Sequence, residues 1–116
     1  MRTGFGRVIA ISSVNVPLHS SGGTIYNSTK AAIENLMQTF TSEYGNEDIT
    51  FNSLGLSIVK HSGMAQGLSE QAAKDKRDKL DKPEDLEIAD VLHAVDFLSD
   101  PLAAKISGQT IYMGAP

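Results

Sequence analysis

The sequence of 116 residues contains no cysteine and no tryptophan, and only 6% of its residues are aromatic. Without cysteine the chain can form neither a disulfide nor a thiolate metal site, and this absence fits a reducing compartment. The apolar stretch at residues 8–11 is far shorter than the ~18 residues that a membrane-spanning helix needs, and no secretory signal pattern is present. We therefore expect a cytoplasmic protein.

The sequence also lacks an excess of basic residues and any pattern of metal ligands. Its net charge of -4 argues against nucleic acid as a partner, because phosphates would remain unneutralised. His19, His61 and His93 are far apart, and no H-E-x-x-H motif occurs, so we expect no metal site.

A third absence concerns the glycine-rich turn that holds dinucleotide phosphates. Such a turn follows a strand and opens a helix, whereas Gly4 and Gly6 precede the first expected strand. The sequence therefore shows no binding site for the pyrophosphate of a dinucleotide.

The elements that are present alternate between strands and helices. Residues 8–12 predict a strand buried on both faces, residues 49–56 a second strand and residues 109–113 a third. A helix is predicted over residues 24–44, ending at a left-handed Gly45, and a second helix begins at Pro83 and ends before Asp100. Long helices between strands imply parallel pairing, so we expect an α/β fold of three parallel strands with flanking helices.

The remaining segments are expected to be loops or weak helices. Residues 15–23 and 57–67 predict loops, and residues 68–80 are polar and helix-permissive. We expect the charges of this last segment to be solvated rather than to form a docking patch for an acyl carrier protein. Its basic side chains are Lys74, Lys76, Arg77 and Lys79.

One constellation of residues suggests chemistry. Tyr26 and Lys30 lie four residues apart on the first long helix, and Ser13 ends the preceding strand, at the edge where parallel sheets bind ligands. A nearby ammonium stabilises a phenolate, so Tyr26 could exchange a proton near neutral pH while Ser13 holds a carbonyl oxygen. The spacing alone is equally compatible with a partly buried tyrosine beside a lysine whose stem covers apolar surface.

The residues around this constellation resemble a known family. The stretch G-R-V-I-A-I-S-S at residues 6–13 and Y-N-S-T-K-A-A at residues 26–32 resemble the active-site region of short-chain dehydrogenases/reductases, closest to the β-ketoacyl-carrier-protein reductase type. Similar matches follow at residues 49–52, 97–100 and 106–110. The resemblance implies the C-terminal half of a Rossmann-like doubly wound parallel sheet, and a carbonyl or alcohol substrate such as a 3-oxoacyl thioester.

The resemblance also implies a role for each matching residue. Tyr26 would be the general acid/base, Lys30 would bind the nicotinamide ribose and favour the phenolate, and Ser13 would orient the substrate oxygen. The cofactor would be NADP or NAD, with NADP slightly favoured, and residues 63–80 would form a substrate lid. The cofactor-binding residues would be Tyr26, Lys30, Leu56, Ser57, Val59 and His61.

Two departures from the family bear on function. Residues 1–116 are expected to form a partial dinucleotide-binding domain that lacks the glycine-rich N-terminal half. In addition, Leu56-Ser57 replaces the usual Pro-Gly, and His61 or Ser62 replaces a Thr. The first strand would then be an open edge, so we expect a homo-oligomer or a complementing N-terminal segment. The alternative function is an inactive fragment that serves as an oligomerisation or binding module.

Overall fold

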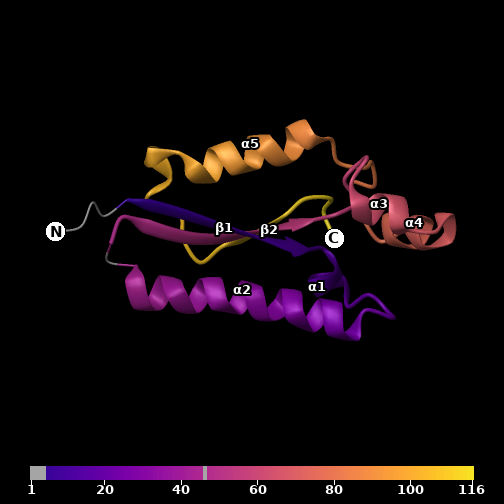
Figure 1. The fold of residues 1–116 in the computed structure, drawn as a ribbon, viewed down its shortest axis with the longest axis horizontal. Coiled ribbons are helices and arrows are strands. Elements are labelled where there is room, and N and C mark those ends of the chain that lie inside the picture. The colour runs from indigo at the N-terminus through magenta and orange to yellow at the C-terminus, as the bar shows by residue number, and fades with distance from the viewer. Residues whose placement is uncertain (1–4, 46) are drawn as a thin grey trace.

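A single parallel sheet organises the computed structural model, which describes residues 5–45 and 47–116. Its strands are β1 (Gly6–Ser13), β2 (Ile49–Leu56) and β3 (Thr110–Tyr112), hydrogen-bonded in the order β1-β2-β3 (Figure 1). Gly6 pairs with Ile49 and Ser13 with Leu56, so β1 and β2 end together. The predicted α/β class and the parallel pairing are confirmed.

Two long helices cover the two faces of this sheet. Helix α2 (Thr24–Tyr44) lies along one face and α5 (Ile88–Ser99) along the other (Figure 1). Met37 of α2 is buried, and the centroid of the Phe40 ring lies 5.4 Å from the centroid of the Phe51 ring in β2. Ile25 and Leu36 on the same helix are exposed, so only part of the apolar pattern of α2 faces the sheet.

Short helices occupy segments that the sequence predicted as loops or, for residues 68–80, as weakly helical. Helix α1 (Asn15–Leu18) follows β1, α3 (Gly63–Gly67) follows β2, α4 (Glu70–Arg77) comes next, and a 3-10 turn η1 (Pro101–Ala103) follows α5. The loop predictions for residues 15–23 and 57–67 were therefore wrong in part. Serine caps explain two of these starts, because Ser62 accepts from the Ala65 amide and Ser69 from the Ala72 amide.

Helix α5 begins later than the sequence predicted. Its first residue is Ile88, and the predicted start at Pro83 was wrong. Leu86 is held in extended backbone, because its amide donates to the Ile58 carbonyl at 2.7 Å and its carbonyl accepts from the Lys60 amide at 2.9 Å. A reciprocal capping box between Glu87 and Asp90 then starts the helix, and its predicted end is confirmed.

Two conformational predictions were also wrong. Gly45 ends α2 with φ of -69°, which is right-handed rather than left-handed, and a Cβ there would collide with the Thr41 carbonyl oxygen. Strand β1 is not buried on both faces, because Val8 is 40% and Ile11 44% exposed. The physical reason is that, among the described residues, β2 is the only strand that pairs with β1, which makes β1 an edge strand.

Buried polar contacts fasten the central strand to the C-terminal segment. The Asn52 side chain of β2 donates to the Ile106 carbonyl at 2.9 Å and accepts from the Gln109 amide at 3.0 Å. These bonds place β3 beside β2 and leave the carboxyl ends of both strands at one edge. Within the described residues, no helix is both long and apolar enough to cross a membrane.

Candidate active site

A cavity of about 420 Å³ lies at the carboxyl ends of β1 and β2. Its walls come from those strand ends, from the first turns of α2, and from α3 and α4. This is the edge at which parallel α/β sheets bind ligands. The three predicted catalytic residues, Ser13, Tyr26 and Lys30, all line it.

Ser13 is fixed at the end of β1 by the turn that follows. Its side chain is buried, and its Oγ accepts a hydrogen bond from the Asn15 amide at 3.0 Å. The hydroxyl proton of Ser13 has no acceptor among the described residues. Ser13 can therefore donate a hydrogen bond to an oxygen in the cavity.

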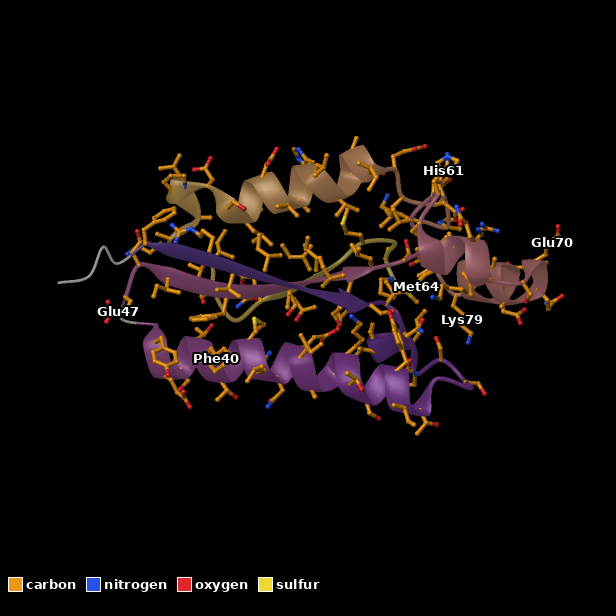
Figure 2. All side chains as sticks on the ribbon, in the orientation of Figure 1. Phe40, Glu47, His61, Met64, Glu70 and Lys79 are labelled. Atoms are coloured by element: carbon orange, nitrogen blue, oxygen red, sulfur yellow. The ribbon has the colours of Figure 1, made fainter. Side chains whose placement is uncertain are left out.

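Tyr26 reaches across the cavity mouth from the first turn of α2. Its hydroxyl donates to the Met64 sulfur of α3 at 3.8 Å, and Figure 2 labels Met64 on that short helix. A thioether is a weak acceptor, so this contact leaves the hydroxyl available to a better partner. In the described chain, the Tyr26 hydroxyl makes no hydrogen bond to Ser13 or Lys30.

Lys30 lies one helical turn after Tyr26. Its Nζ donates to the Ile11 carbonyl at 2.9 Å and lies 5.7 Å from the centre of the Tyr26 ring. The hydrogen bond to β1 fixes the ammonium beside the phenol ring. The predicted proximity of the two side chains is thus present without a direct bond between Nζ and the hydroxyl.

The predicted cofactor residues divide into two groups. Leu56, Ser57 and Val59 line the cavity, whereas His61 does not. His61 has a left-handed backbone with φ of 63° and an exposed side chain, and in Figure 2 it lies on the α5 side of its loop, away from Met64. The turn closed by the Ser62 amide and the Val59 carbonyl carries His61 out of the site.

One buried polar atom tests whether a nicotinamide group suits this cavity. Ser57 lines the cavity, but its Oγ is buried beside Gly114, out of reach of solvent, and has no hydrogen-bond partner in the described part of the chain. A ligand in the cavity does not reach that oxygen, whereas the largely apolar walls would accept a nicotinamide ring. The cavity walls therefore fit the nicotinamide ring, and the Ser57 hydroxyl is not part of that fit. Gly4, which the sequence placed outside any phosphate-binding turn, lies outside the described residues.

A carboxylate beneath the site was missed by sequence reasoning. Glu34 of α2 accepts a hydrogen bond from the Tyr112 hydroxyl of β3 at 2.6 Å, and its other oxygen accepts from the Ser12 hydroxyl of β1. Burial, the hydrogen bond and the charge of Glu34 together raise the pKa of Tyr112. Glu34 follows Lys30 by one turn, which places it on the sheet-facing side of α2, but its partner on β3 has no sequence signal.

The structure also corrects the predicted exposure of one lysine in the polar segment of residues 68–80. Lys76 was predicted to be solvated, yet it is half-buried and lines the cavity. Lys74 and Lys79 are exposed as predicted. As for metals, residues 5–45 and 47–116 contain no group of three or more His, Asp or Glu side chains placed to hold an ion.

Comparisons with known proteins agree with this architecture. A family model described as enoyl-(acyl carrier protein) reductase matches residues 1–115. A tropinone reductase homolog of Arabidopsis thaliana is 30% identical over 110 residues, covering 94% of this chain and 41% of that protein. A 3-oxoacyl-[acyl-carrier-protein] reductase of Rickettsia conorii is also 30% identical, over 109 residues that cover 94% of this chain and 45% of that protein.

A solved structure extends the agreement to three dimensions. A short-chain type dehydrogenase/reductase from Mycobacterium ulcerans superposes with a TM-score of 0.85 at 25% identity, covering 95% of this chain and 40% of that one. The chain spans less than half the length of the relatives it matches. The family model, the relatives and the shared fold together show that the chain belongs to the short-chain dehydrogenase/reductase family of oxidoreductases.

Proposed function

We propose that the protein is an NAD(P)-dependent oxidoreductase that reduces a carbonyl compound or oxidises the corresponding alcohol. The observation that carries this proposal is the convergence of Ser13, Tyr26 and Lys30 on one cavity at the carboxyl ends of two parallel strands. We further propose that residues 1–116 supply the catalytic part of a dinucleotide-binding domain and not its glycine-rich part. Family membership and the Rickettsia conorii relative support this assignment.

Each side chain has a distinct task in the proposed reaction. The Ser13 hydroxyl donates to the carbonyl oxygen and orients it in the cavity. Tyr26 delivers its phenolic proton to the alkoxide oxygen, which requires it to leave Met64 when substrate binds. Lys30 stabilises the phenolate that remains. In the direction of alcohol oxidation, Tyr26 takes the proton back.

The cofactor side of the site is proposed to be the loop after β2. Leu56, Ser57 and Val59 would line the nicotinamide ring. When bound, the dinucleotide supplies or accepts the hydride. We propose NADP or NAD, with NADP slightly favoured, and a substrate of the 3-oxoacyl thioester type, since one relative is named for that substrate. His61 is not proposed to contact the cofactor.

We also propose a partner that covers the free edge of β1. An apolar edge strand presents unpaired backbone groups to another strand. Val8 and Ile11 are the exposed apolar side chains of this edge. Either a second copy of the chain or a complementing segment with further strands would cover it, and adenosine and pyrophosphate binding would depend on such a segment.

The test is reduction of a β-ketoacyl thioester by NADPH, followed by the absorbance of the reduced cofactor. We expect Tyr26→Phe to lower the rate by at least ~100-fold, because a positioned general acid contributes that much. Tyr44→Phe, a change of the same kind at an exposed position of α2, should leave the rate unchanged. If the protein oxidises no NADPH even when a partner covers the β1 edge, the proposed activity is wrong and an inactive binding module is favoured.

A further inference from the structure

Lys76 is a half-buried cation in the wall of the catalytic cavity. It belongs to α4, and it also lines the neighbouring cleft beside Asn15 and Ser20. Burial lowers the pKa of Lys76, because the charged form loses hydration there. Holding an ammonium in that position without a counter-charge costs free energy. A bound anion would lower that cost.

The acidic side chains of this segment do not supply that counter-charge. Within residues 5–45 and 47–116, no hydrogen bond or ion pair engages the Lys76 ammonium. The neighbouring carboxylates have other partners, each at 2.7 Å: Asp75 with Gln71, Asp78 with Lys74, and Asp85 with Arg77.

The rest of the cavity is positive and mostly apolar. Its described charged residues are Lys30 and Lys76, with no carboxylate among the lining side chains. Lys30 already donates to the Ile11 carbonyl and lies beside Tyr26, so in the proposed reaction it acts at the carbonyl that is reduced. Lys76 is therefore the cation that remains for a ligand.

We propose that Lys76 binds an anionic group, a carboxylate or a phosphate, carried by the carbonyl substrate that Ser13 and Tyr26 hold. This inference rests on the proposed function and narrows its substrate class to carbonyl compounds with a negatively charged group. A cavity of about 420 Å³ suits a small molecule with a few placed polar contacts. A charge-assisted hydrogen bond within apolar walls would select the anionic substrate over a neutral one of the same shape.

Binding of a matched pair of ligands tests the proposal without turnover. Levulinate and methyl levulinate share a ketone and differ in charge, so their dissociation constants, measured by NMR titration, isolate the anion contact. We expect levulinate to bind the unsubstituted protein more tightly, and Lys76→Gln to weaken levulinate about tenfold while leaving the ester unchanged. Lys76→Arg should retain most of the preference, and it serves as the check that α4 still folds.

Lys79→Gln is the matched control, because it removes the same charge from an exposed position that lines only the neighbouring cleft. Equal weakening by both substitutions would overturn the proposal. So would a loss of NADPH affinity in Lys76→Gln with the levulinate preference intact, since the cation would then serve a cofactor phosphate. If the protein reduces carbonyl compounds but binds levulinate no more tightly than its ester, this inference is wrong and the proposed function stands. If it prefers levulinate but reduces no carbonyl compound, only the proposed function is wrong.

Discussion

At the residue scale, Glu34 ties the helix that carries Tyr26 and Lys30 to two strands. Its carboxylate accepts from Ser12 on β1 and from Tyr112 on β3. Removing it leaves two partly buried hydroxyls without their acceptor, which costs about 1–3 kcal/mol. We expect Glu34→Ala to lower the free energy of unfolding by that amount in urea titrations.

Glu43→Ala provides the comparison for that substitution. Glu43 lies near the end of the same helix and is exposed, so its removal should change stability by no more than about 0.5 kcal/mol. Equal effects of the two substitutions would show that the Glu34 network does not hold α2 to the sheet.

Tyr112 gives the same network a pH dependence. Its pKa in the folded protein is raised above the value of about 10 for an exposed tyrosine. The protonated phenol therefore contributes stability that is present in full below about pH 10 and is lost as the pH rises toward the folded pKa. We expect the free energy of unfolding to fall more steeply above about pH 10 in the unsubstituted protein than in Tyr112→Phe. Tyr44→Phe should retain the steep fall, and a Tyr112→Phe profile parallel to that of the unsubstituted protein would contradict this prediction.

The sequence predicts some of the site residues and misses others for a physical reason. Tyr26 and Lys30 share a helical face, and Ser13 ends the strand before it, so local periodicity and chain order bring them together. Contacts such as that between Glu34 and Tyr112 join residues far apart in the chain, and only the assembled sheet places them side by side. The burial of Lys76 likewise depends on how α4 packs, which a polar segment does not reveal.

At the element scale, one ion pair anchors α4 to the segment before α5. Arg77 donates to both oxygens of Asp85, at 2.9 and 2.7 Å, and this contact lowers the pKa of Asp85. The stabilisation is present above the ordinary aspartate pKa of 3.8 and is lost as the pH falls through the lower folded value. Above pH 5, we expect Asp85→Asn to speed amide hydrogen exchange in α4 about two- to fivefold, the range for a partly exposed pair.

Glu84→Gln removes the adjacent exposed carboxylate and should leave exchange in α4 unchanged. The difference between Asp85→Asn and the unsubstituted protein should also vanish in strong acid, where Asp85 is protonated in both the folded and unfolded states. Unchanged exchange in Asp85→Asn at neutral pH would show that packing, and not the ion pair, holds α4.

The elements that local signals define were predicted well. Strand β2 has the predicted bounds of Ile49–Leu56, and α2 the predicted bounds of Thr24–Tyr44. The start of α5 was missed because backbone pairing of Leu86 with the loop after β2 overrides the helix-favouring signal of Pro83. A contact from a distant segment, absent from any local window, decides that boundary.

At the scale of the whole molecule, the chain buries less surface than a compact monomer of its mass would. Its accessible surface is 7217 Å², against about 6100 Å² expected for 12.4 kDa. Its radius of gyration is 15.2 Å, against about 13 Å for a compact domain of this length. Part of the excess is apolar and lies along β1 and on α5, where Val8, Ile11 and Leu92 are exposed.

An edge strand with apolar side chains and unpaired backbone groups tends to recruit another strand, whereas lysine on such an edge opposes pairing. We therefore expect residues 1–116 to associate in solution, and the double substitution Val8→Lys and Ile11→Lys to shift the mass measured by light scattering toward that of the monomer. Leu102→Lys is the matched control, because Leu102 is 93% exposed on η1 and is not part of the strand. If the unsubstituted chain is instead a monodisperse monomer that unfolds cooperatively, the β1 edge tolerates solvent. In that case the hydrogen bonds between β1 and β2 and the packing of α2 and α5 suffice to hold three strands without a fourth.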